Sequence, residues 1–315
     1  MNISVIIPTL NRPDDLKLAL ESIGRQTLRP AQVIVVDQST GDESLNAVFE
    51  VRQKYPELSD SLVYVSQTVR SLVKARNNGM ALASGDVISF LDDDVVLFDD
   101  YYARVLPFFE DPEVGGVSGN TLVKKEMKGL KWKLRKAVMR FFMLSDFNGG
   151  MTASGFGYPV YEREIDRPIA VQMLPGCNMN FRKKDVRGLE FDEWFSGYGF
   201  REDADFSYRV SLKARLLMTP DARLHHNYSP ANRMKIYTLK KMELKNYYYM
   251  FKKYKRRSGL SCVLFGYSFI GLILIDLIEF LTNLDGGKWC KLRAEMSLAW
   301  GFAFRTLRKA LVPAE

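Results

Sequence analysis

Strands and helices alternate through the first hundred residues, and this alternation constrains the fold more than any other feature of the sequence. Apolar runs rich in β-branched residues predict buried strands at residues 3–9, 32–39, 62–67 and 87–91. Helical spacing of the apolar residues between them predicts helices at residues 16–24, 43–55 and 72–84. Strands separated by single helices are typical of a mostly parallel sheet flanked by helices on both faces. The sequence therefore predicts an α/β fold.

Polar side chains follow the predicted strands where those strands end. Residues 9–12 close the first strand, Asp37 lies at the end of the second, and residues 92–94 follow the fourth. In open parallel sheets, ligands bind beyond the carboxyl ends of the strands. We therefore expect these side chains to converge along one edge of the sheet.

Three consecutive carboxylates, Asp92, Asp93 and Asp94, stand between two apolar runs in the segment GDVISFLDDDVVLFDD. Adjacent like charges repel and are costly close to a core unless a counter-charge meets them. Carboxylate oxygens are suitable ligands for Mg²⁺ or Mn²⁺. A solvated turn or a helix cap is the alternative. The position at a strand end favours a cation site.

The composition points to a globular protein in a reducing compartment. Of 315 residues, 47% are apolar and 26% are charged, which excludes a disordered chain. Cys177, Cys262 and Cys290 are too far apart in sequence for a CxxC metal site or a disulfide framework. The first residues have neither the basic region nor the cleavage site of a signal peptide. We expect the catalytic part to stay in the cytoplasm.

The net charge of +8 is concentrated toward the C-terminus, where a basic segment precedes a long apolar run. Residues 235–257 are dense in Lys and Arg, and residues 258–275 contain no charged residue before Asp276 and Glu279 interrupt the run. A helix of 18 residues rises about 27 Å, slightly less than the roughly 30 Å of a hydrocarbon core. Residues 258–282 are thus a marginal spanning segment or an interfacial helix.

A basic flank beside an apolar run is typical of cytoplasmic membrane attachment. We therefore expect the inner-membrane surface as a partner. We expect no nucleic acid, because the basic segment would be the only argument for one. Residues 124–145 are also basic and amphipathic and would suit the same surface. The alternative is a hydrophobic helical hairpin that packs on the catalytic domain.

Two common phosphate-binding loops are missing, because no GxGxxG follows the first strand and no GxxxxGK[ST] occurs. Six other segments occur in a fixed order: SVIIPTLNRPDDLKLALESI, VIVVDQST, KARNNGMALASGD, FLDDDV, GCNMNFRKKDV and FREDADFSYR. Together they closely resemble the family 2 glycosyltransferases, which are inverting enzymes of the GT-A fold that use nucleotide-activated sugars. The resemblance covers residues 1–230 and implies a catalytic domain there, followed by a helical, membrane-associated region at 231–315.

The resemblance assigns the strand ends to the nucleotide-sugar donor. It implies that the wall of the nucleotide pocket consists of Pro8, Thr9, Asn11 and Arg12. Asp37 would hydrogen-bond the base, with an ordinary strand-end turn as the alternative. Arg76 and Asn77 would flank the donor, and Arg76 could contact the diphosphate. A salt-bridged helix residue is the alternative for Arg76.

The three aspartates resemble the DxD motif of the family. Asp94 would then bind the divalent cation (Mn²⁺ or Mg²⁺), Asp92 would contact the ribose, and Asp93 would support one of them. The segment PDARLHHNYSP resembles the strand that brings a histidine to the metal, and counting from Pro220 selects His226 over His225. A hydrogen-bonded structural histidine is the alternative.

Glu202 and Asp203 resemble the acidic pair of the family. Asp203 would be the base that takes the acceptor proton, and Glu202 would orient the acceptor; capping of a helix that begins near Glu202 is the alternative. The reaction would be a single displacement with inversion. The segment PGCNMNFRK and Trp194 could line the sugar or acceptor subsite, whereas Met179 and Phe181 suit the core.

Two other functions compete with this interpretation. A nucleotidyltransferase would have a glycine-rich, basic loop after the first strand, where this chain has TLNRPDD. A non-catalytic protein that binds sugar nucleotides or glycans would not need the acidic pair at 202–203. The basic and apolar C-terminal region suits a lipid-linked saccharide acceptor in cell-surface polysaccharide synthesis. One fold hosts many specificities, so the donor sugar stays open.

Overall fold

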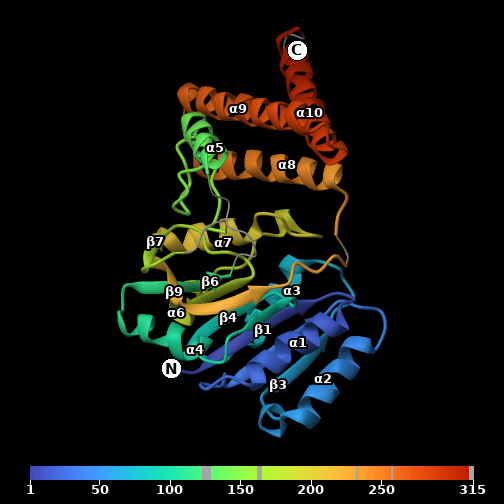
Figure 1. Ribbon diagram of the computed structural model, residues 1–315, viewed down its shortest axis with the longest axis vertical. Coiled ribbons are helices and arrows are strands. Elements are labelled where there is room, and N and C mark those ends of the chain that lie inside the picture. Colours follow the sequence, from blue (N-terminus) through green and yellow to red (C-terminus); the bar gives the residue numbers. More distant parts are fainter. Residues whose placement is uncertain (123–128, 162–164, 232, 257, 312–315) are drawn as a thin grey trace. The chain divides into compact units, whose positions relative to one another are not determined.

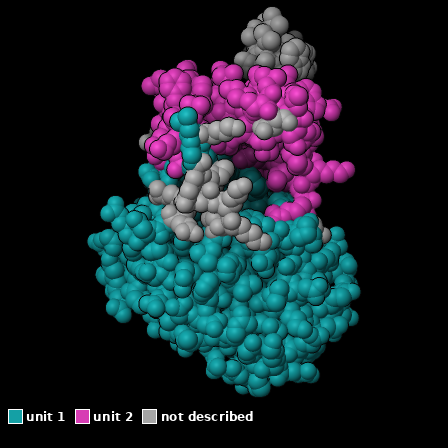
Figure 2. Space-filling view, viewed as in Figure 1, with its two compact units in different colours: residues 1–132, 147–151, 158–232 teal, residues 133–146, 152–157, 233–315 magenta. Residues whose placement is uncertain are grey.

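The computed structural model describes residues 1–122, 129–161, 165–231, 233–256 and 258–311 (Figure 1). The chain divides into two compact units, which are coloured separately in Figure 2. Unit 1 comprises residues 1–132, 147–151 and 158–232, and unit 2 comprises residues 133–146, 152–157 and 233–315. The boundary that the sequence predicts, between residues 230 and 231, stays a prediction; unit 2 also includes two segments from the middle of the chain.

Unit 1 is built on a sheet with the strand order β3-β2-β1-β4-β8-β6-β9-β5, and β7 pairs with β9. The four predicted strands are confirmed as β1 (Ile3–Thr9), β2 (Gln32–Asp37), β3 (Leu62–Ser66) and β4 (Val87–Leu91). The pairings among these four strands are all parallel. The helices between them are α1 (Pro13–Gly24), α2 (Glu43–Lys54) and α3 (Leu72–Leu82). Parallel neighbours need such crossovers, which explains why the alternation predicted this half.

The other half of the sheet is mixed. It consists of β5 (Val95–Leu97), β6 (Val114–Thr121), β7 (Ile169–Val171), β8 (Asn178–Arg182) and β9 (Arg215–His226). Strand β8 runs antiparallel to both β4 and β6, whereas β6 and β9 are parallel. The sheet is therefore parallel on one side of β4 and changes direction on the other.

Short helices complete unit 1. These are η1 (Pro56–Leu58), α4 (Tyr101–Val105), η2 (Leu106–Glu110), α6 (Lys183–Val186), η3 (Glu193–Phe195) and α7 (Glu202–Ser211). Helix α7 begins at the residue where the sequence predicts a helix start. Met179 and Phe181 of β8 are fully buried, and the ring of Phe181 contacts those of Phe90 and Phe206. Their predicted place in the core is confirmed.

Strand register brings the polar strand ends together. Thr9 is the register partner of Asp37 at the ends of β1 and β2. In the mixed half of the sheet, His226 at the end of β9 pairs with Val95, the residue that follows Asp94. The acidic loop between β4 and β5 therefore lies beside the last residue of β9.

Unit 2 contains the helices α5 (Leu130–Phe141, from Lys133 onward), α8 (Ile236–Tyr254), α9 (Gly259–Asn283) and α10 (Gly286–Leu311). Of the amphipathic segment predicted at 124–145, residues 123–128 lie outside the described residues. Residues 259–282 form a helix that is long and apolar enough, by length and composition, to cross a membrane. Asp276 and Glu279 interrupt the apolar run but not the helix, because both carboxylates have cationic partners within unit 2.

Candidate active site

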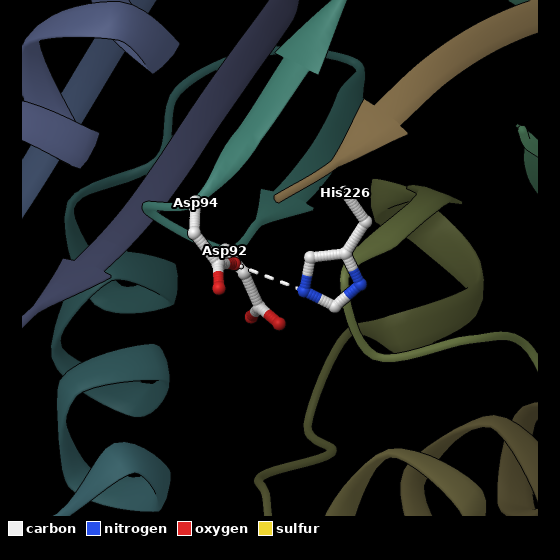
Figure 3. A group of neighbouring side chains, drawn as sticks. All are labelled: Asp92, Asp94 and His226. Carbon is white, nitrogen blue, oxygen red and sulfur yellow. Dashed lines mark ion pairs between the residues drawn. The ribbon is translucent and has the colours of Figure 1, made fainter. Parts of the chain in front are cut away.

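Asp92, Asp94 and His226 form one group at the edge of the sheet of unit 1. One possible ligand atom from each residue lies within 4.8 Å of the others, and the three side chains point toward one another (Figure 3). The Nε2 atom of His226 is 3.0 Å from Oδ1 of Asp94. Asp92 is the most open of the three, since 31% of its side chain is exposed against 2% for Asp94.

Asp93 is not a member of this group, and its carboxylate binds residues at the end of β1. The hydroxyl of Thr9 donates to its Oδ2 over 2.8 Å, and Nη1 of Arg12 donates to its Oδ1 over 3.0 Å. The other terminal nitrogen of Arg12 donates to the carbonyl of Ala231. Burial raises the pKa of Asp93 to about 7 against the opposing effect of Arg12.

Asp94 has partners of its own. The backbone N–H of Ser229 donates to its Oδ2 over 2.9 Å, and Arg12 lies 3.8 Å from the same oxygen. Burial would raise the pKa of Asp94, but the hydrogen bond from His226, with Ser229 and Arg12, outweighs burial and lowers it. Each of the three adjacent carboxylates therefore has a cationic partner: Arg76 for Asp92, Arg12 for Asp93, and His226 together with Arg12 for Asp94. These partners explain how the run of aspartates is tolerated beside a core.

His226 is the cationic partner of Asp94. Burial lowers the pKa of its imidazole, but the hydrogen bond to Asp94 and the neighbouring Cys177 thiol outweigh burial and raise it to about 11. The preceding residue, His225, lies against the ring of Phe98 instead. The structure thus places His226, and not His225, beside the aspartates.

Two carboxylates and an imidazole are a suitable donor set for Mn²⁺ or Mg²⁺. All three groups bind a metal in their deprotonated form, so a cation would take the place of the proton on His226. The sequence assigned Asp94 and His226 to the metal and Asp92 to the ribose. In the structure Asp92 is a third member of the same donor group.

Arg76 of α3 connects this group to the acidic pair. Its side chain is 1% exposed; Nη1 donates to Oε1 of Glu202 over 2.8 Å, and Nη2 donates to Oδ1 of Asp92 over 3.2 Å. Nη2 also donates to the carbonyl of Gly176, and the guanidinium lies 5.3 Å from the ring centre of Phe191. Arg76 thus forms salt bridges on both sides, and its contact with a donor diphosphate stays a prediction.

Glu202 and Asp203 begin α7 and have different surroundings. Glu202 is 5% exposed, and burial, together with the charge of Asp203, raises its pKa to about 8 despite the contact with Arg76. Arg201, just before the pair, has a positive φ of 79°, a conformation that non-glycine residues rarely adopt. This turn directs two consecutive carboxylates into the same buried region.

Among the residues that the structure describes, Asp203 accepts hydrogen bonds from three donors. Its Oδ2 accepts from the hydroxyl of Tyr161 over 2.8 Å and from the N–H of Gly176 over 2.9 Å. Its Oδ1 accepts from the N–H of Ala204 over 2.8 Å. A carboxylate offers about four acceptor positions, so one remains for a further donor.

Tyr161 was not among the residues expected from the sequence, because it belongs to no recognised motif and follows a glycine-rich stretch without periodicity. Gly176 lies within the segment PGCNMNFRK, which the sequence linked to the sugar or acceptor subsite. A Cβ atom added to Gly176 would lie 2.9 Å from Oδ2 of Asp203. Only glycine allows this backbone to approach the carboxylate so closely.

The residues predicted to hold the nucleotide base lie at the ends of β1 and β2. Asp37 is buried; its Oδ1 accepts from Ser39 and its Oδ2 accepts from the hydroxyl of Tyr64 over 2.7 Å. Burial and the bond to Asp37 raise the pKa of Tyr64. Asn11 has a positive φ of 52°, and its N–H donates to the hydroxyl of Ser39.

Two further predicted residues have partners other than the carboxylates. Pro8 is a β1 residue whose register partner is Val36. The side-chain amide of Asn77 donates to the backbone carbonyl of Phe191 and accepts from the backbone N–H of the same residue. These bonds fix the backbone of Phe191, whose ring lies against Arg76. Trp194 is 54% exposed.

The sequence model described as glycosyl transferase family 2 matches residues 4–187. Glycosyltransferase GlyA of Streptococcus pneumoniae serotype 4 is 31% identical over 117 residues, which is 36% of this chain and 16% of that protein. The minor teichoic acid biosynthesis protein GgaB of Bacillus subtilis is 36% identical over 110 residues, 34% of this chain and 12% of that protein. The chain thus spans only a minor part of these relatives.

Solved structures share the fold at low sequence identity. A mannosyltransferase of Pyrobaculum calidifontis in complex with GDP-Man and Mn²⁺ is 18% identical with a TM-score of 0.54, covering 97% of this chain and 82% of that one. S. aureus TarS residues 1–349 in complex with UDP are 16% identical with a TM-score of 0.53, covering 96% and 92%. At such identities, the likeness concerns the fold alone.

Proposed function

Because this chain belongs to glycosyl transferase family 2 and has the GT-A fold, we propose that it is an inverting glycosyltransferase that uses a nucleotide-diphosphate sugar. The observation that carries the proposal is the juxtaposition of two groups in unit 1. Arg76 contacts both Asp92 of the candidate metal group and Glu202 of the acidic pair. A donor site and a base would thereby adjoin each other.

The donor would lie along the strand ends. Pro8, Thr9, Asn11 and Arg12 would line the nucleotide pocket, and Asp37 would hydrogen-bond the base from a position fixed by Ser39 and Tyr64. Asp92, Asp94 and His226 would hold Mn²⁺ or Mg²⁺. When bound, the cation would supply positive charge for the diphosphate leaving group.

Asp203 would act as the base. Its one remaining acceptor position would receive the acceptor hydroxyl and take its proton. The hydroxyl oxygen would form a bond to the anomeric carbon as the bond to the diphosphate breaks on the opposite face. Glu202 would orient the acceptor, and Arg76 would position both Glu202 and Asp92. Attack from the opposite face inverts the anomeric configuration.

We infer that the acceptor is a lipid-linked saccharide at the cytoplasmic face of the cell membrane, in cell-surface polysaccharide synthesis. Support comes from the candidate membrane helix at residues 259–282 and from the similarity to a teichoic acid biosynthesis protein. The segment predicted at 258–282 would attach the protein peripherally or as one marginal span.

The stereochemistry of the product tests the proposal most simply. The purified protein is incubated with Mn²⁺ and a panel of UDP-, GDP- and dTDP-sugars, and the sugar released to water is followed by proton NMR. Inversion of the first-formed anomer, abolished in Asp203→Asn, is the expected result. Retention of configuration, or unchanged turnover in Asp203→Asn, would contradict it. A protein that only binds sugar nucleotides would release no sugar.

A further inference from the structure

Helix α9 exposes a continuous apolar stripe along one side. Six of its large apolar residues are between 40% and 68% exposed: Leu260, Val263, Ile270, Leu274, Ile278 and Leu281. Their spacings of three, four and seven residues place them on a single face of the helix. From the first to the last of them, the helix rises about 32 Å. A contiguous apolar surface of this length marks an interaction site.

The opposite face of α9 is covered and contains polar groups. Ser268 and Asp276 are buried there. The carboxylate of Asp276 is 3.2 Å from Nζ of Lys240 on α8, and Glu279 forms an ion pair with Arg135 on α5. If lipid surrounded α9 on all sides, these charges and the basic helix α8 would be drawn into hydrocarbon, which is costly. Among the described residues, the packing therefore leaves one side of α9 for an apolar partner.

Helix α5 lies beside α9 and extends the stripe. The hydroxyl of Tyr267 on α9 donates to the carbonyl of Phe141 on α5, and the rings of Tyr267 and Phe142 are 5.1 Å apart. Leu134 and Phe141 of α5 are 64% and 69% exposed. Helices α5 and α9 thus present apolar side chains together.

Exposed cations accompany this apolar surface. Lys133 and Arg140 lie on the same helix as Leu134 and Phe141. Lys252, Lys253 and Arg256 are exposed at the end of α8, directly before α9 begins at Gly259. Apolar residues flanked by Lys and Arg match an anionic lipid surface, which offers hydrocarbon and negative headgroups together.

We propose that α9 and α5 dock unit 2 in the plane of an anionic membrane, with the stripe buried in one leaflet and no segment of α9 crossing the bilayer. This inference rests on the membrane association within the proposed function and specifies its geometry. The bilayer supplies the apolar contacts that the exposed stripe lacks, while Asp276 and Glu279 keep their cationic partners within unit 2.

Vesicle flotation tests the docking surface. The stripe variant is Ile270→Ser/Leu274→Ser/Ile278→Ser, and the control variant Leu18→Ser/Phe49→Ser/Leu212→Ser removes equally exposed apolar side chains from unit 1. With phosphatidylcholine vesicles containing phosphatidylglycerol, partitioning of the stripe variant should fall at least roughly tenfold. The control variant should float like the wild type. Vesicles of pure phosphatidylcholine should bind the wild type and the control variant more weakly.

Depth measurements distinguish docking from spanning. Nitroxide labels are placed at Val263→Cys, Ile270→Cys and Leu281→Cys in a Cys262→Ser/Cys290→Ser background, since the remaining Cys177 is buried. In-plane docking predicts similar, shallow depths at all three positions. A label at 270 near the bilayer centre, with shallow labels at 263 and 281, would overturn the proposal in favour of a spanning helix.

Two other results would also overturn it. One is equal flotation of the stripe variant and the wild type. The other is a wild-type dimer in light scattering that the stripe variant converts to a monomer, which would assign the stripe to a second copy of the chain. Donor hydrolysis is measured in parallel in detergent. Its absence from the wild type and both variants would count against the glycosyltransferase function and leave the docking result standing.

Discussion

The guanidinium of Arg76 donates a hydrogen bond to the carboxylate of Glu202 over 2.8 Å, and both side chains are buried. The same guanidinium reaches Asp92, which belongs to the candidate metal group. Residues from three separate parts of the chain therefore share one buried cation. This contact links the place where a donor diphosphate would lie to the place where an acceptor would be deprotonated.

Glu202→Gln should change how stability depends on pH. The folded-state pKa of Glu202 is raised from 4.5 to about 8, so between these values the folded state binds more protons than the unfolded state. Stability from this group is present below pH 4.5 and is lost as pH rises through 8. We measure the free energy of unfolding with urea, in EDTA. Between pH 5 and pH 8 it should fall by on the order of 1–3 kcal/mol more in the wild type than in Glu202→Gln.

Glu193→Gln is the matched control, because 63% of its side chain is exposed. Its stability should follow the wild type at every pH. A wild-type stability that falls no more steeply than that of Glu202→Gln would show that Glu202 is ionised in the folded protein at neutral pH.

Gly176→Ala should slow turnover without weakening donor binding. The new methyl group would lie 2.9 Å from Oδ2 and 3.0 Å from Cβ of Asp203, so the carboxylate would have to move. Displacement of a reacting group by about an ångström can cost up to roughly a hundredfold in rate. We expect kcat for donor hydrolysis to fall by about ten- to a hundredfold, with the donor Kd from calorimetry unchanged. Gly266→Ala, where a Cβ meets nothing within 4 Å, should leave both values unchanged.

Tyr161→Phe should alter the pH profile of turnover. The lost hydroxyl donates to Oδ2 of Asp203, and a hydrogen bond to a carboxylate favours its ionised form. We expect kcat to fall about tenfold, in line with 1–2 kcal/mol for one such bond, and the acid limb of the kcat profile to move to higher pH.

Tyr64→Phe provides the contrast, because the hydroxyl of Tyr64 donates to Asp37 at the expected base pocket. Its removal should raise the KM for the donor and leave the shape of the kcat profile unchanged. The assignment of Tyr161 to Asp203 would be wrong if the two variants behaved alike.

The parallel half of the fold and the convergence of strand ends could be predicted from the sequence, because both follow from local patterns. Each strand of this half is a largely apolar run, and each crossover helix has its own periodicity. The mixed half gave no such signal. Strands β7 and β8 are short, and their antiparallel pairings join segments whose separation in sequence does not specify a partner.

The candidate site divides in the same way. Asp92–Asp94, Arg12 and His226 lie at strand ends or in motifs, and the structure brings them together. The direct partners of the carboxylates could not be predicted, since Ser229 lies 135 residues from Asp94 and Tyr161 lies 42 residues from Asp203. Ser229 and Tyr161 both lie in irregular segments, where no periodicity indicates which way a residue faces. The burial of Arg76 likewise depends on α3 and α7 meeting in space.

Metal-dependent donor binding tests the central claim most directly. Thermal unfolding of the wild type and of Asp94→Asn is measured with UDP-, GDP- and dTDP-sugars, in Mn²⁺ and in EDTA. A ligand that binds only the folded state raises the unfolding temperature by an amount that grows with the ratio of its free concentration to its Kd. We predict that at least one donor stabilises the wild type in Mn²⁺ but not in EDTA, and that Asp94→Asn loses this effect. Equal stabilisation in EDTA, or in Asp94→Asn with Mn²⁺, would contradict the account.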